Sequence, residues 1–170
     1  DEVVDPFFVV RLFAVHRKLR RAAVPRVVRL DQVHRVADDQ IALTYSEVEG
    51  ESLLDVMRRG PLPVAWSLEV LHQVCESIAA AHAVGVTHGA IGPASVVCHR
   101  TDDRPEVGLL DFGLASVARG RIDSQLVPAH PMTPEAVLGG GTRVSEDIYQ
   151  IGCLAYWMLS GIPPFDAKDM

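Results

Sequence analysis

Residues 64–84 carry the clearest structural pattern in the sequence. Apolar residues recur there at spacings of three, four and three, which places them on one face of a helix: Leu71, Val74, Ile78 and Ala81. Gly85, directly after this run, is typical of a helix C-terminus. A long helix with one apolar face needs other elements to cover that face. The pattern therefore predicts a packed domain organised around this helix.

Shorter patterns surround the long helix. Helices are predicted at residues 7–22, 51–59 and 145–159, strands at 33–36, 41–48, 95–98 and 106–110, and a Gly/Pro-rich loop at 113–145. The order is helix, two strands, helices, a β-hairpin, a long loop and a final apolar helix. This order indicates a mixed α+β domain dominated by helix, and periodicity alone does not indicate a function.

Composition excludes several classes of protein. With 170 residues, 48% of them apolar, the chain suits one globular domain. A net charge of −6 without a basic stripe argues against nucleic-acid binding. Three widely spaced cysteines argue against a disulfide framework or a zinc site, and favour a cytoplasmic location. The longest apolar run, residues 148–159, is shorter than the ~20 residues of a membrane span.

Several short motifs follow one another in a fixed order. His88-Gly89-Ala90-Ile91-Gly92-Pro93-Ala94-Ser95 is followed by Asp111-Phe112-Gly113, Thr133-Pro134-Glu135, Asp147 to Gly152, and Gly161-Ile162-Pro163-Pro164-Phe165. In order and spacing, this set resembles the protein kinase superfamily, and bacterial Ser/Thr kinases in particular. The corresponding family patterns are H-R-D-x-K-P-x-N, D-F-G, A-P-E, D-x-x-x-x-G and G-x-x-P-F. Each motif is weak alone, but the ordered set is specific.

The resemblance implies a protein-kinase-like α+β fold that is incomplete at both ends. Residues 1–47 would be a partial small lobe with its C-helix and the two strands after it. Residues 48–50 would end the hinge, and residues 51–170 would form a partial, mostly helical large lobe. That lobe would run through its central helix to the Pro-Pro-Phe turn. The Gly-rich loop and the lysine-bearing strand of the family have no counterpart here, and Val15 stands where the lysine's glutamate partner is expected.

The catalytic loop departs from the family pattern at four positions. Ala90 replaces the aspartate that takes the substrate proton, and Gly92 replaces the lysine that contacts the transferring phosphoryl group. Ser95 replaces the asparagine that binds the second metal ion, and Gly89 replaces the arginine that reads a phosphorylated activation loop. The resemblance therefore implies no catalytic residue among these four.

Other positions keep the residue types that the family uses. The resemblance implies nucleotide contacts at Ser46, Val48, Val97 and Asp111, with Asp111 also the one candidate metal ligand. ATP and Mg²⁺ are thus possible cofactors, although the favoured interpretation of Asp111 is a structural turn residue that is hydrogen-bonded to backbone. Structural roles are implied for a further set: His88, Phe112, Gly113, Glu135, Asp147 and Gly152.

These observations support three functional hypotheses and one simpler one. The first is a catalytically inactive pseudokinase that regulates or scaffolds other signalling proteins in a bacterium. The second is an ATP-binding switch without phosphotransfer, and the third is a divergent Ser/Thr kinase with residual activity. The simpler hypothesis is a fragment without activity of its own, whose uncovered apolar surface promotes aggregation.

Overall fold

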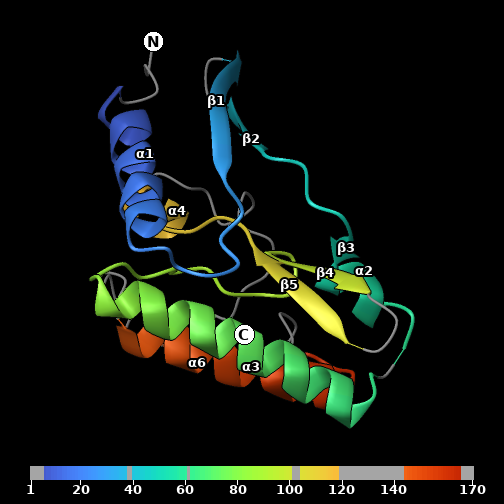
Figure 1. Cartoon of the computed structure of the whole chain (residues 1–170). Coiled ribbons are helices and arrows are strands. Elements are labelled where there is room, and N and C mark those ends of the chain that lie inside the picture. The colour runs from blue at the N-terminus through green and yellow to red at the C-terminus, as the bar shows by residue number, and fades with distance from the viewer. Residues whose placement is uncertain (1–5, 38–39, 61, 101–103, 119–143, 166–170) are drawn as a thin grey trace.

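The structure, a computed structural model, describes residues 6–37, 40–60, 62–100, 104–118 and 144–165. The described residues form a two-stranded and a three-stranded sheet. In Figure 1 the smaller sheet lies at the top beside a helix, the larger sheet lies in the middle, and long helices lie at the bottom. This mixed helix and strand content agrees with the α+β fold predicted from the sequence. None of the described helices combines the length and apolarity that crossing a bilayer requires.

The upper part consists of α1 (Pro6–Arg21), β1 (Leu30–Ala37) and β2 (Gln40–Tyr45). The two strands are antiparallel, and Leu30 is paired with Tyr45. α1 buries Leu12 and Leu19 and exposes a basic C-terminal turn. Cations there interact favourably with the negative end of the helix dipole.

The lower part contains the three-stranded antiparallel sheet and most of the helices. Its strands, in the order β3-β4-β5, are β3 (Glu51–Ser52), β4 (Val96–Arg100) and β5 (Pro105–Leu109). The helices of this part are α2 (Leu53–Met57), α3 (Val64–Ala83) and α6 (Val144–Ser160). α4 (Leu114–Ala118) lies beside α1 and contacts it (Figure 1). α3 and α6 lie side by side beneath the sheet (Figure 1) and contact each other.

The core lies between α3, α6 and the three-stranded sheet. α3 contributes Val70, Val74 and Ile78, and α6 contributes Leu154 and Met158, all almost inaccessible to solvent. Burial of apolar side chains of this size stabilises a fold by about 1.5–3 kcal/mol each. The apolar face predicted for residues 64–84 is therefore the face that builds the core.

A short segment after α1 joins the upper and lower parts. The N–H of Val28 donates to the carbonyl of Leu109 at 2.9 Å, and the N–H of Leu109 donates to the carbonyl of Arg26 at 2.7 Å. These bonds form a parallel bridge between Val27 and Leu109, so the segment extends along β5. The end of β5 is therefore held beside the segment that leads into the upper layer, which consists of α1, β1 and β2. Asp111 lies two residues after the last residue of β5, Leu109.

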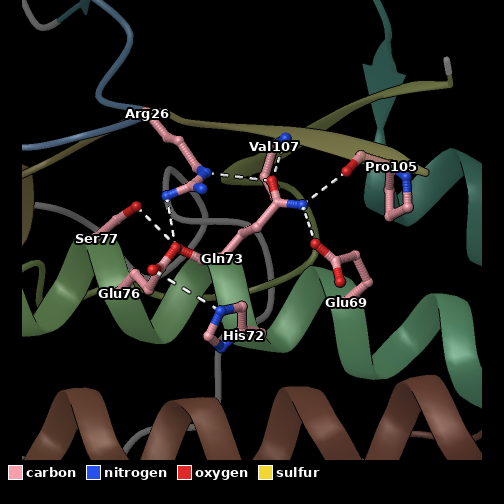
Figure 2. Close-up of polar contacts among 8 residues, drawn as sticks. All are labelled: Arg26, Glu69, His72, Gln73, Glu76, Ser77, Pro105 and Val107. Carbon is pink, nitrogen blue, oxygen red and sulfur yellow. Dashed lines mark hydrogen bonds and ion pairs between the residues drawn. The ribbon is translucent and has the colours of Figure 1, made fainter.

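Gln73 on α3 forms hydrogen bonds to β5 and to Arg26 in the segment that follows α1 (Figure 2). Its side-chain nitrogen donates to the carbonyl of Pro105 at 2.7 Å, and its oxygen accepts from the N–H of Val107 at 3.1 Å. The same oxygen accepts from Nε of Arg26 at 3.2 Å, and Arg26 also pairs with Glu76 at 3.0 Å. One buried amide thus satisfies two backbone groups of β5 and orients an arginine.

We expect Gln73→Leu to lower the free energy of unfolding by roughly 2–4 kcal/mol, because it leaves buried backbone donors and acceptors unpaired. Leucine has a side chain of similar size, so the change in the free energy of unfolding reports mainly the lost polar contacts. Gln32→Leu is the matched control, since Gln32 is exposed on β1 and should change stability by less than about 0.5 kcal/mol. Urea titrations of both variants measure the difference, and equal costs would contradict this role for Gln73.

Most element boundaries shift by a few residues from the sequence expectation, and the larger differences are these. The helix predicted at residues 51–59 is shorter, because Glu51 and Ser52 pair with β4 before α2 begins. The strand predicted at 41–48 ends at Tyr45. The loop predicted at 113–145 is wrong for residues 114–118, which form α4, and residues 119–143 lie outside the described part of the chain.

Candidate functional site

The first turn of α6 holds the loop that contains the degenerate catalytic residues. The Asp147 carboxylate is fully buried and accepts the N–H of His88 at 2.9 Å and the N–H of Gly89 at 2.7 Å. Nε2 of His82, at the end of α3, lies 2.6 Å from the same carboxylate. Asp147 thus holds the backbone of the loop, and His82 adds a partner from a second helix.

Gln150 extends this support by one helical turn. Its side-chain oxygen accepts the N–H of Ile91 at 2.8 Å, and its nitrogen donates to the carbonyl of Gly89 at 3.1 Å. Asp147 and Gln150 are three residues apart and therefore share a face of α6. Together they satisfy four backbone groups across residues 88–91, so the conformation of the loop is set by α6.

His88 and Phe112 form the buried centre beneath the loop. Their rings are 4.6 Å apart between centroids, and neither side chain is accessible to solvent. Nδ1 of His88 accepts the N–H of Ala90 at 3.3 Å, so the histidine is used in holding the loop. Leu19 of α1 belongs to the same buried cluster as Phe112, which connects this centre to the upper layer.

The loop positions themselves carry little chemical functionality. Ala90 is buried and offers a methyl group, and Gly92 offers only backbone. The Ser95 hydroxyl is buried, accepts the N–H of Gly92 at 3.1 Å and donates to the carbonyl of Gly92 at 3.0 Å. Its hydrogen-bonding capacity is therefore used to close the loop on itself. The Gly89 backbone has a φ of +82°, a region that favours glycine over the arginine of the family pattern.

Asp111 lies just beyond β5 and contacts Tyr45, the last residue of β2. The Tyr45 hydroxyl donates to a carboxylate oxygen of Asp111 at 2.7 Å and accepts the N–H of Asp111 at 3.2 Å. Burial raises the pKa of Tyr45, and the neighbouring Asp111 charge raises it further. The phenol therefore stays protonated at neutral pH and acts as a hydrogen-bond donor to Asp111.

α1 places Val15 and His16 beside this pair. A β carbon on Gly113 would lie 2.8 Å from Val15, so α1 and the Asp111-Phe112-Gly113 turn are in close contact. The His16 ring is buried, 6.4 Å from the Tyr45 ring, and it has a hydrogen bond with the Phe112 backbone. Burial lowers the pKa of His16, so it is mainly neutral at neutral pH and supplies little positive charge to Asp111.

The residues expected to contact a nucleotide are only partly brought together. Val48 and Val97 both lie near Gly108, where a β carbon would be 3.5 Å from Val48 and 3.9 Å from Val97. A cavity of about 460 Å³ is lined by Ser46 and Val48, but its described lining residues include neither Val97 nor Asp111. The Ser46 N–H donates to the carbonyl of Arg29 at 2.9 Å, which ties it to the segment that enters β1.

Glu135 lies outside the described residues, and Gly152 is exposed on α6 with open space beside it. Within the ranges that the structure describes, no three His, Cys, Asp or Glu side chains are grouped in a way that could hold a metal ion. Asp111 thus belongs to no such group in this part of the chain.

The sequence did not predict the contacts of four residues that organise this region. They are Tyr45, His82, Gln150 and Gln73. The spacing of Gln150 from Asp147 is a usable signal, because residues three apart lie on one helix face. His82 belongs to none of the family motifs. The contact of Tyr45 with Asp111 joins residues 66 apart in sequence, and no local pattern indicates it.

A helical lower layer, a small upper layer, and a loop held by a buried aspartate define the kinase class of fold, and the comparisons agree. Residues 10–170 match the family described as "Protein kinase domain". The chain belongs to the protein kinase family. It is 33% identical over 157 residues to serine/threonine-protein kinase pkn2 of Myxococcus xanthus, covering 88% of this chain. It is 32% identical over 170 residues to PknH of Mycobacterium bovis, covering 97% of this chain.

Solved structures show the same fold. The kinase domain of Mycobacterium tuberculosis PknI, in the form of a double mutant, superimposes with a TM-score of 0.71 at 24% identity, covering 95% of this chain and 62% of that one. The Rad53 kinase domain in complex with AMPPNP gives 0.70 at 26% identity, covering 94% and 56%. The chain spans only 19% of the length of pkn2 and 28% of the length of PknH.

Proposed function

We propose that this chain is a pseudokinase module that acts in bacterial signalling by regulating or scaffolding other proteins. The observation that carries the proposal is the contrast within one loop. α6 holds its backbone through Asp147 and Gln150, while Ala90 and Gly92 provide neither a carboxylate nor an ammonium group. A supported loop without reactive side chains suits a protein-binding role.

The chemical cost of these substitutions supports the proposal. Phosphoryl transfer depends mainly on positioning and on charge stabilisation. Loss of a general base typically lowers a rate by about 10²–10⁴-fold. Loss of one transition-state charge contact costs a further ~10²–10³-fold in comparable sites. Neither Ser95, whose hydroxyl is bonded to Gly92, nor Asp111, which is bonded to Tyr45, is positioned as a replacement.

A divergent Ser/Thr kinase is the second candidate. It is favoured by membership of the protein kinase family and by similarity to proteins described as serine/threonine-protein kinases. It is also favoured by Asp111, the one expected metal ligand that the chain retains. We rank it second because the base and the phosphoryl-binding cation have no counterpart among the described residues. A cytoplasmic location and protein partners are part of the proposal in either case.

A complementation experiment tests the proposal. In a strain that lacks the gene, wild type and Asp111→Asn should restore the phosphoprotein profile equally, because a scaffold does not require the metal ligand. Asp147→Ala should fail to restore it, because it releases the loop from α6. If Asp111→Asn failed while the protein was present at wild-type level, the chain would act by catalysis and the pseudokinase proposal would be wrong.

A further inference from the structure

A cavity of about 600 Å³ lies between α1 and the segment that leads into β1. α1 and β1 stand side by side in the upper part of Figure 1 and contact each other. The lining side chains come from residues 9–20 and residues 24–30, and we call this cavity the α1 groove. Its volume is in the range of sites that hold a small ligand or a few side chains of a partner.

The α1 groove is lined mostly by apolar side chains. Leu30 is buried at the start of β1, Phe13 is half-buried on α1, and Val10 is 65% exposed. Val24 and Val27 add half-buried apolar surface from the segment between α1 and β1. Apolar surface that stays open to water in a concave site favours association with an apolar group. The groove therefore suits a large apolar side chain.

Three exposed arginines give the same groove a positive charge. Arg17 and Arg20 are three residues apart and share a face of α1, and in the described part of the chain neither is paired with a carboxylate. Arg29 bonds to Asp31 through Nε, but its side chain remains 65% exposed. Burial lowers the pKa of His16, which also lines the groove, so the charge comes from the arginines. The described lining residues include no Asp or Glu. Because guanidinium groups bind carboxylates through paired N–H donors, the groove complements an acidic ligand.

α1 connects the groove to the candidate site. The His16 ring lines the groove, is 6.4 Å from the Tyr45 ring and has a hydrogen bond with the Phe112 backbone. Its neighbour Val15 is in close contact with the turn at Gly113. A ligand in the groove therefore binds to the same helix that packs against this turn.

We propose that the α1 groove docks a segment of a partner protein that carries a large apolar side chain flanked by carboxylates. The apolar side chain packs against Phe13 and Leu30, and the carboxylates pair with Arg17 and Arg20. The apolar lining favours a protein segment over a nucleic-acid backbone, which would leave these side chains uncovered. The inference rests on the proposed function and deepens it, because it names the class of partner that the pseudokinase module would regulate or scaffold.

Selection from a random peptide library tests the proposal. Peptides of about twelve residues, displayed on phage, are selected on the full-length protein, and the enriched peptides are synthesised with a fluorescent label for anisotropy titration. They should share a large apolar residue with at least two Asp or Glu close to it. Arg17→Glu with Arg20→Glu should weaken their binding at least about tenfold, because two attractive contacts become repulsive.

Lys18→Glu with Arg21→Glu is the matched control. It makes the same change in net charge at two exposed positions of the same helix that are not among the lining residues of the groove. At about 0.15 M salt, where the Debye length is about 8 Å, charges outside the groove are largely screened. The control should therefore keep the affinity within about twofold of wild type. If the Arg17→Glu and Arg20→Glu pair does not fold, Arg17→Gln with Arg20→Gln removes both charges and keeps good helix formers.

Four outcomes would overturn the docking proposal. These are no enrichment of any peptide, enriched peptides that lack the apolar or the acidic residues, equal weakening in the two charge-reversed pairs, and binding to phosphatidylserine vesicles in place of peptides, which would make the groove a lipid contact. The pseudokinase proposal fails separately, through phosphotransfer by the wild type that Asp111→Asn abolishes, and such a result would leave the peptide affinities unchanged.

Discussion

Asp147→Ala is expected to lower the free energy of unfolding by roughly 3–5 kcal/mol. The substitution removes the acceptor for two buried backbone N–H groups, those of His88 and Gly89, and leaves the His82 ring without its carboxylate partner. All of these groups lie in the interior or at its edge, so water replaces the lost bonds poorly. The loop over residues 88–91 should loosen first, because it loses the two bonds to Asp147 and keeps those to Gln150.

Asp55→Ala is the matched control. Asp55 also lies in the first turn of a helix and has hydrogen bonds with Ser52 and Arg58, but its side chain is exposed. Exposed contacts of this kind contribute little, so its cost should remain below about 1 kcal/mol. Urea titration gives both values, and hydrogen exchange at Gly89 and Ile91 locates the loss. An Asp147→Ala cost no greater than that of Asp55→Ala would remove the central support that we assign to α6.

The sequence predicts those elements whose pattern is local. The apolar face of α3 repeats over several turns, and α6 starts with acidic residues and continues as an apolar run, so both helices are predicted within one or two residues. β3 could not be predicted, because its two residues are strand only through pairing with Cys98 and Val97 of β4. α4 was missed because it lies in a segment rich in glycine and proline.

In the candidate site too, local sequence patterns locate the residues but do not predict their contacts. His88, Ala90, Gly92, Asp111 and Asp147 are located by motif order, since the resemblance assigns them through spacing. The contacts that decide what these residues can do are not visible in the sequence. The hydrogen bond from Tyr45 to Asp111 forms because the end of β2 lies beside the end of β5. The hydrogen bond from Ser95 to Gly92 forms because the loop folds back on itself. Such contacts follow from packing of distant segments, on which local patterns carry no information.

We propose that this member of the protein kinase family keeps the support of its catalytic loop without the groups that transfer phosphate. Loss of the base and of the phosphoryl-binding cation affects the transition state rather than the fold. The proposed loss of activity is therefore compatible with Asp147, Gln150 and the His88–Phe112 centre remaining in place. Kinases that carry both the base and the phosphoryl-binding cation typically turn over at about 1–100 s⁻¹.

The most direct measurement is transfer of the γ-phosphate of ATP by the full-length protein, to itself and to a generic protein substrate, with Mg²⁺ or Mn²⁺. We expect a rate at least about 10³-fold below that of ordinary kinases, and equal within error in wild type and Asp111→Asn. Turnover within the ordinary range that is lost in Asp111→Asn would contradict the account, because Asp111 would then hold a working metal ion beside a base and a cation supplied by other residues.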